Sequence, residues 1–423
     1  MTARLHRLAN GVRVVADPMA GLESAALSVV VRGGARWEAP ERNGWSHLLE
    51  HMVFKGAGAR TSREIVEAIE GEGGWINAAT GYERTSYQVR HLAGGLPLAM
   101  EVLADLVRRP VVDPSELERE KGVIGQEIAE AADTPDDRVF DLAQARAFHD
   151  QAMGRPILGL DSTLAPATRD ALLSHHTALY GDPARLVVSA AGAVDEDELL
   201  RLAEAAFGDM APRPAAPPLA PAAFRGGAEA EARPLEQAHM VLLLPGVAAN
   251  DADYWPQRLF AEVLGGGMAS RLFQEAREAR GLCYAVDAYA EAYEDTGLLG
   301  IYAGVSDRDA APMARLAAAE LAKLAAQIGE AELARAKAQA RSSLHMGRES
   351  PLNRAEGAAA QLHMLGRLVP PAEIAARIDA VGPADIARYG ARVLGAGASA
   401  AAVLGRKRAG TAAPAFAEAL AAA

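Results

Sequence analysis

A chain of 423 residues, half of them hydrophobic and 23% charged, has the composition of a globular protein and is long enough for two cores of ordinary size. Its formal net charge of −12 argues against nucleic acid as a general partner and favours basic ligands in the encounter step. The longest apolar runs are too short to span a membrane, and the single cysteine, Cys283, excludes an internal disulfide and fits a reducing compartment.

The chain begins with a predicted hairpin. Residues 1–18, MTARLHRLANGVRVVADP, have the pattern of a strand, an Asn-Gly turn and a second strand. They lack the apolar stretch of a secretory leader. A cytoplasmic location is therefore the expectation.

The next predicted helix carries two histidines and a glutamate. In GWSHLLEHMVFKG, residues 44–56, His47 and His51 are four apart and Glu50 precedes the second. Residues four apart share a helix face, so both imidazoles can point at one metal ion, with Glu50 close enough to accept a proton from water beside it. The alternative is a pair of ordinary helix histidines, one packed and one solvated. A third ligand on another helix decides between these interpretations.

A helix predicted in SELEREKGVIGQEIAEAAD, residues 115–133, offers that ligand. Glu120 and Glu127 are two turns apart and share a face, with Val123 and Ile124 between them. A carboxylate on such an apolar face needs a partner if it is buried. Considered alone, both glutamates are more often solvated helix charges.

The second half contains a glycine-rich segment, LGGGMASRLFQEAREARGLCYAV, residues 264–286. Its glycines lack the spacing of a phosphate-binding loop. We interpret them as a flexible turn before a helix that starts near Ser270, with Leu272 and Phe273 facing the core. Cys283 is interpreted as a small packing residue rather than a nucleophile.

The two halves of the chain have related patterns, which indicates duplication. Residues 115–138 overlay residues 331–354 at a constant offset of 216, and several residues recur. The recurring residues are Glu116, Leu117, Arg119, Lys121, Pro135 and Arg138, matched by Glu332, Leu333, Arg335, Lys337, Pro351 and Arg354. Glu120 and Glu127 are replaced in the second half by alanine and serine. The alternative is that two alanine-rich helices match by composition.

The predicted fold class is α+β, with two homologous domains that each contain a mixed or antiparallel sheet packed with helices. We expect an N-terminal metal-binding domain over 1–210, a linker rich in proline and alanine over 211–236, a homologous C-terminal domain without the metal site over 237–405, and an alanine-rich tail over 406–423.

Four segments in this order resemble the pitrilysin/insulinase family of zinc peptidases. They are HLLEHMVFKG, NAATGYERTSY (77–87), EREKGVIGQE (118–127) and DTPDDRVFD (133–141). The resemblance runs from about residue 10 to residue 400 and is closest to the short-chain branch, which includes the mitochondrial processing peptidases. It implies a processing-peptidase-like metallohydrolase fold.

The resemblance also implies the roles of the polar residues in the first half. His47, His51 and Glu127 would bind one zinc ion per chain, and Glu50 would be the general base. Glu120 would support the site by contacting a ligand rather than the metal.

Four further residues acquire a substrate-binding role from the resemblance. Arg277 and Tyr284 match an arginine and a tyrosine that hold the substrate carbonyl in the family, and both are donors suited to that task. Asn77 and Ala78 match an edge strand that pairs with an extended peptide. The alternative for Asn77 is a turn residue before a strand.

The function that follows is a zinc-dependent endopeptidase that hydrolyses peptides or unfolded segments inside a chamber formed by paired two-domain chains. We expect a dimer, either of this chain or with a related chain, and peptide substrates that the negative charge would bias toward basic ones. The alternatives are a non-catalytic structural subunit and a metal-binding regulator. The substrate, the choice between processing and degradation, and whether Arg277 and Tyr284 serve their own chain's zinc stay open.

Overall fold

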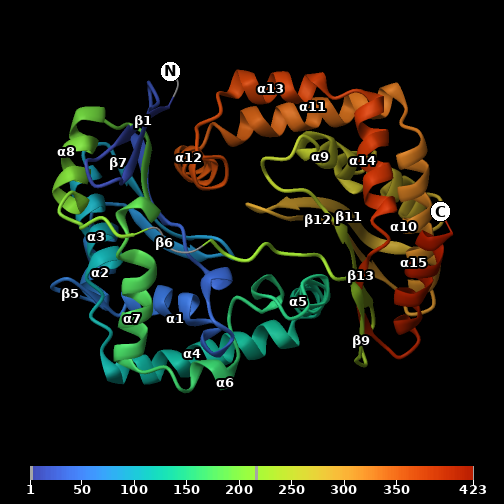
Figure 1. The fold of residues 1–423 in the computed structure, drawn as a ribbon, viewed down its shortest axis with the longest axis horizontal. Coiled ribbons are helices and arrows are strands. Elements are labelled where there is room, and N and C mark those ends of the chain that lie inside the picture. Colours follow the sequence, from blue (N-terminus) through green and yellow to red (C-terminus); the bar gives the residue numbers. More distant parts are fainter. Residues whose placement is uncertain (1–2, 215–217, 423) are drawn as a thin grey trace. The chain divides into compact units, whose positions relative to one another are not determined.

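The computed structural model describes residues 3–214 and 218–422, which form two compact units of one large sheet and its covering helices (Figure 1). Unit 1 is assembled from Met1–Ala129, Pro156–Leu219 and His345–Pro370. Unit 2 is assembled from Glu130–Arg155, Ala220–Leu344 and Pro371–Ala423. The predicted α+β fold with two sheet-and-helix domains is confirmed.

The sheet of unit 1 has six strands in the order β1-β2-β8-β3-β7-β6. Their bounds are Arg4–Arg7 (β1), Arg13–Pro18 (β2), Ser24–Val31 (β3), Trp75–Thr80 (β6), Thr85–Leu92 (β7) and Leu186–Gly192 (β8). Only the β2–β8 pair is parallel among these strands, so the sheet is mixed. The predicted N-terminal hairpin is present as β1 and β2, and Gly11 in its turn has the left-handed φ of 103°.

Helices cover both faces of this sheet. The helices of this part of the chain are α1 (Trp45–Val53), α2 (Ser62–Gly71), α3 (Leu96–Arg108), α4 (Pro114–Asp133), α6 (Asp161–Leu164), α7 (Arg169–Tyr180), α8 (Glu196–Phe207) and α12 (Pro351–Leu365), and the two-residue strands are β4 (Gly56–Ala57) and β5 (Arg60–Thr61). All seven residues of β8 are buried. Successive side chains of a strand point to opposite faces, so each face needs its own cover. Val188 belongs to the larger core, whereas Val187 packs with Leu362 of α12.

The sheet of unit 2 repeats this arrangement without a counterpart of β1. Its order is β11-β12-β10-β13-β9, with one parallel pair, β9–β13. The strands are Gly227–Ala232 (β9), Ala238–Pro245 (β10), Cys283–Ala292 (β11), Gly297–Val305 (β12) and Ala400–Gly405 (β13). The helices are α5 (Pro135–Ala147), α9 (Tyr254–Gly265), α10 (Ala310–Ala326), α11 (Glu330–Gly347), α13 (Pro371–Ala380), α14 (Pro383–Gly395) and α15 (Ala412–Ala421).

The repeated topology supports the duplication inferred from the sequence. Strand order, strand direction and the position of the parallel pair agree between the sheets. Helices α4 and α11 begin 216 residues apart, as do α5 and α12. By order along the chain, α1 corresponds to α9 and α4 to α11.

The two sequence repeats exchange one helix each. Helix α5, encoded in the first half, packs on β10 and β13 of unit 2, and α12, encoded in the second half, packs on β3 and β8 of unit 1 (Figure 1). The predicted linker at 211–236 therefore separates two sequence repeats, while the compact units are assembled from interleaved segments.

The predicted linker and the predicted tail each contain a regular element. Residues 227–232 of the predicted linker form β9, which pairs in parallel with β13 and so satisfies backbone groups at that edge. Most of the predicted tail is helix α15, whose buried Ala412 and Phe416 belong to the core of unit 2. The predictions of a linker and a tail, which rested on composition and on the lack of an apolar period, did not anticipate these two elements. No helix of the described residues has the length and apolar character needed to cross a membrane.

Candidate metal centre

Helix α1 presents its polar residues on one side of an otherwise buried helix. Leu48, Leu49 and Met52 have no exposed surface and belong to the core, while His47 and His51 are partly exposed. The two imidazole rings lie with their centroids 4.6 Å apart. The four-residue spacing thus places both imidazole rings on the same face of the helix, as expected.

Buried Glu38 holds the start of this helix. Its carboxylate accepts hydrogen bonds from the backbone N–H groups of Gly44 at 2.8 Å and Ser46 at 2.6 Å. Burial raises the pKa of Glu38, and these N–H groups oppose that rise. The helix therefore begins at a fixed position, which is a condition for directing two imidazoles at one point.

Helix α4 supplies the third candidate ligand. Oε2 of Glu127 lies 3.8 Å from Nε2 of His47 and 3.6 Å from Nε2 of His51. Among the described residues these three form the group whose ligand atoms all lie within 4.8 Å of one another. Donors about 2.0–2.2 Å from a single zinc ion lie roughly 3–4 Å apart, so the spacing fits that metal. Two imidazole nitrogens and one carboxylate oxygen are also a donor set that zinc accepts while keeping a position open.

A chain of contacts fixes the orientation of His51. Its Nδ1 lies 3.0 Å from Oε2 of Glu120, and Oε1 of the same carboxylate accepts from Nζ of Lys55 at 2.6 Å. Glu120 is buried. With the proton of His51 on Nδ1, the lone pair of Nε2 is free to bind a metal.

His47 is held in the form that binds metal. Burial, with the neighbouring His51, lowers the pKa of His47 to about 4. The imidazole is therefore neutral near pH 7. Neutral imidazole is the form that coordinates zinc.

Glu50 lies beside the cluster and has its own partner. Oγ1 of Thr80, the last residue of β6, donates to Oε2 of Glu50 at 2.5 Å. Burial raises the pKa of Glu50, and the Thr80 hydrogen bond opposes that rise. One carboxylate oxygen is thus fixed by protein, as a proton-transferring group requires.

Asn77 and Ala78 lie inside β6, which pairs with β7 on one side and is the edge strand of the sheet on the other. Asn77 is paired with Gln88, so the alternative interpretation of a turn residue is wrong. The side chain of Asn77 is exposed. The free edge of β6 offers backbone groups to an extended peptide.

Arg277 and Tyr284 lie together within unit 2. The guanidinium of Arg277 is 5.3 Å from the ring centroid of Tyr284 and 4.7 Å from that of Phe273, and Tyr284 is 74% exposed. Residues 273–278 form a π-helical turn, which the sequence did not predict. Cys283 is buried and burial raises the pKa of its thiol, in keeping with the predicted packing role.

Sequence reasoning missed two residues of the centre, Thr80 and Lys55. Lys55 is four residues after His51, so helix spacing could have indicated it. Thr80 is 30 residues from Glu50, and no local pattern connects them.

The comparisons with known proteins agree with this fold. Residues 13–161 match the family model described as insulinase, peptidase family M16, and residues 166–340 match the model described as the peptidase M16 inactive domain. An uncharacterized zinc protease of Streptomyces coelicolor is 36% identical over 93% of this chain and 88% of that protein. Another, from Bacillus subtilis, is 36% identical over 81% of this chain and 83% of that protein.

Solved structures share the fold at low sequence identity. A peptidase M16 inactive domain from Pseudomonas fluorescens superposes with a TM-score of 0.89 at 17% identity, covering 96% of this chain and 99% of that one. A protease from Helicobacter pylori gives 0.87 at 19% identity, covering 96% and 99%. A chain of complex III2 from Candida albicans gives 0.86 at 19% identity, covering 99% of both.

These findings define the class as the α+β, two-domain fold of the M16 peptidases. The chain belongs to peptidase family M16, the insulinase family. The inferred resemblance to the pitrilysin/insulinase family is confirmed.

Proposed function

We propose that this chain is a zinc-dependent endopeptidase. The observation that carries the proposal is the convergence of His47, His51 and Glu127 on one point, with the carboxylate of Glu50 beside them. Zinc in such a site supplies Lewis-acid polarisation of water and of a peptide carbonyl. The relatives named zinc proteases support the same reaction class.

The residues of the chain take distinct roles in the proposed hydrolysis. Glu50 accepts a proton from the attacking water and passes it to the leaving amine, while Thr80 holds the carboxylate in place. The edge of β6 at Asn77 and Ala78 pairs with the extended substrate, which gives affinity through the main chain.

Arg277 and Tyr284 are proposed donors to the substrate carbonyl oxygen. A guanidinium and a phenol hydroxyl stabilise negative charge that develops on this oxygen. Their mutual contact and the exposure of Tyr284 support a joint role in binding rather than in packing.

We further propose a dimer of two-domain chains that encloses peptides or unfolded segments, in the cytoplasm, with a preference for basic peptides. The net charge of −12 supports that preference. The second candidate is a non-catalytic subunit of a larger assembly. This second candidate is kept because the fold is similar to that of a chain of complex III2.

Two substitutions separate the enzyme from its rivals. Glu50→Gln should leave zinc content unchanged and reduce peptide cleavage by about 10²–10⁴-fold, because a proton-transfer group is lost. Glu127→Gln should reduce zinc content itself, because a ligand is lost. Glu130→Gln, at an exposed position of the same helix, is the matched control and should change neither quantity.

Two measurements are needed. Elemental analysis gives the zinc content, and digestion of a peptide library with and without chelator gives the cleavage activity. Cleavage at the normal rate by the Glu50→Gln protein would disprove the base assignment. A zinc-loaded unmodified chain that cleaves nothing in the library would favour the structural subunit.

A further inference from the structure

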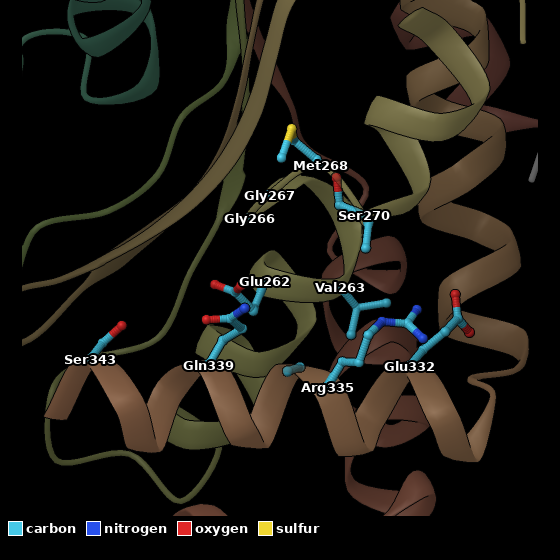
Figure 2. Close-up of a pocket in the computed structure, with 12 residues that line it drawn as sticks. Glu262, Val263, Gly266, Gly267, Met268, Ser270, Glu332, Arg335, Gln339 and Ser343 are labelled. Carbon is cyan, nitrogen blue, oxygen red and sulfur yellow. The ribbon is translucent and has the colours of Figure 1, made fainter. Parts of the chain in front are cut away.

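A polar pocket of about 250 Å³ lies within unit 2, between the end of α9 and one face of α11 (Figure 2). By order along the chain, α9 and α11 are the counterparts of α1 and α4, which carry the metal centre in unit 1. Ala336 and Ser343 line this pocket. At the offset of 216 residues they occupy the positions of Glu120 and Glu127, so two short side chains replace two long ones and leave space.

The pocket is lined by polar side chains that the protein does not satisfy. Among the described residues, five of them have no hydrogen bond and no ion pair through their side chains: Glu262, Ser270, Arg335, Gln339 and Ser343. Ser270 is only 5% exposed, and its Oγ is buried without a partner. A buried hydroxyl without a partner is uncommon. Arg335, Gln339 and Ser343 are exposed and Glu262 is half-buried, so these side chains are accessible to a polar ligand.

Two of these residues carry opposite charges that do not neutralise each other. Glu262 is half-buried at the end of α9, and Arg335 lies on α11. The other acidic residue of the pocket, Glu332, is already engaged by Arg271 and by the backbone N–H of Gly329. A ligand that carries both charges would pair with Glu262 and Arg335 at once.

The arrangement of the charged groups indicates the length of such a ligand. In Figure 2 the side chains of Glu262 and Gln339 point toward the same part of the pocket, whereas Arg335 lies toward Glu332. Arg335 and Gln339 are one turn apart on α11, about 6 Å along the axis. Because the side chains of Gln339 and Arg335 start from different turns and point to different parts of the pocket, a ligand that reaches both must be longer than a single amino acid. A dipeptide is the shortest peptide that meets this requirement. Val263 offers an apolar wall for a small side chain.

We propose that this pocket binds a zwitterionic dipeptide. Glu262 and the amide oxygen of Gln339 receive the ammonium group, and Arg335 receives the carboxylate. The proposal goes beyond the peptidase activity and does not depend on it, although short products of peptide hydrolysis have this chemistry. The pocket would then sense or retain small peptides at a position where the duplicated half has no metal ligands.

Calorimetric titration of the full-length, zinc-loaded chain tests the proposal, with Glu50→Gln present to prevent turnover. Ala-Ala should bind with one site per chain. N-acetyl-Ala-Ala, which lacks the ammonium, and Ala-Ala-amide, which lacks the carboxylate, should each bind at least tenfold more weakly.

Substitutions in the pocket assign each end of the ligand. Glu262→Gln should weaken binding of Ala-Ala at least tenfold, and this variant should bind Ala-Ala and N-acetyl-Ala-Ala with the same affinity. Arg335→Gln should bind Ala-Ala and Ala-Ala-amide with the same affinity. Ala336→Leu fills the pocket and should prevent binding. Glu330→Gln and Arg341→Gln, exposed on the same helix and outside the pocket, are matched controls that should bind as before.

The outcomes separate clearly. Absence of saturable binding of Ala-Ala, equal affinity for the capped peptides, or binding unchanged by both Glu262→Gln and Arg335→Gln would each overturn the proposal. Circular dichroism of every variant, together with the normal zinc content of the metal centre, verifies that the chain is folded. Failure of peptidase activity in the unmodified chain would leave these binding results intact, because they are measured without turnover.

Discussion

Three glutamates that lie close to the two histidines in space have different surroundings, and these surroundings support the different roles that we propose for them. Glu127 directs an oxygen at both imidazoles, Glu120 is buried against His51 and Lys55, and Glu50 is bound by Thr80. Burial raises the pKa of Glu50. A carboxylate with a raised pKa is better suited to exchange protons near neutral pH.

At this scale we predict that Thr80→Val lowers kcat by about ten- to a hundredfold, since a hydrogen bond to a charged group contributes roughly 1.5–3 kcal/mol. KM and zinc content should stay unchanged, because Thr80 contacts Glu50 rather than a metal ligand. Thr80→Ser retains the hydroxyl and should restore most of kcat. Steady-state kinetics of the two variants is the measurement, and equal kcat in both would contradict the positioning role.

The residue-level prediction from sequence was successful where spacing on one helix determines proximity. His47 and His51 converge because they are four apart, and Glu120 and Glu127 face the same way because they are seven apart. The meeting of α1 with α4 came from the family resemblance and could not be derived from either helix. Thr80 was missed because sheet geometry, rather than sequence spacing, brings it to Glu50.

At the scale of elements, α12 is the cover of one face of the unit 1 sheet. Ala359 and Leu362 are buried against strand residues that include Val187. Arg13 of β2 donates to the backbone oxygen of Leu362 and contacts Nδ1 of His363 at 3.2 Å. Burial, followed by the positive charge of Arg13, lowers the pKa of His363 to about 3. The helix is thus docked with a neutral histidine.

This arrangement predicts that α12 loosens in mild acid. The pKa of His363 is about 6.5 in the open state and lower in the docked state, so the open state binds more protons below pH 6.5 and docking weakens as the pH falls. At pH 5 the free energy that docks α12 is about 2 kcal/mol less favourable than at pH 7. This loss can be measured by hydrogen exchange of the α12 backbone amides at pH 7 and pH 5, with each exchange rate corrected for its intrinsic pH dependence.

His363→Gln removes the titration and keeps an acceptor for Arg13, so it should remove most of the pH dependence. His345→Gln, at an exposed position, is the matched control and should not. Protection of α12 that is independent of pH in the unmodified chain would refute this account of its docking.

Element identities were predictable to a useful degree, and element partners were not. The first hairpin, the helix that carries His47 and His51, and the later strands have local patterns of turn residues and apolar period. The partner of β9 is β13, more than 160 residues away, and no local pattern identifies that partner. The alternation of Ala and Glu in β9 has the period of two that is typical of a half-buried strand, but it was overlooked within a segment interpreted from its composition. The tail helix α15 was missed because alanine-rich segments fit a buried helix and a disordered tail equally well.

At the scale of the whole molecule, the chain is a duplication whose two sequence repeats exchange helices α5 and α12. Each exchanged helix covers the sheet of the other repeat. A unit built from one contiguous half would therefore leave an apolar sheet face without its layer. We therefore expect the two halves to depend on each other for folding, and the sequence repeat alone does not reveal the exchange.

We predict that a fragment of residues 1–210 is poorly folded alone and is improved by tethering residues 345–370 to it. The tethered segment supplies α12, which buries Val15, Val30 and Val187. Thermal unfolding with a dye that binds exposed apolar surface should show a higher Tm and less dye binding for the tethered fragment. A tethered segment with Leu362→Asp is the control, and equal behaviour of all three fragments would contradict the exchange.

The central claim is that His47, His51 and Glu127 bind one zinc ion. Zinc X-ray absorption on the purified chain tests it most directly, in parallel with elemental analysis of Glu127→Gln. The account predicts one zinc per chain with two imidazole nitrogens and only oxygen otherwise at about 2.0–2.2 Å, and marked zinc loss in the variant. A sulfur ligand, an absence of imidazole, or full zinc occupancy with unaltered coordination in Glu127→Gln would contradict it.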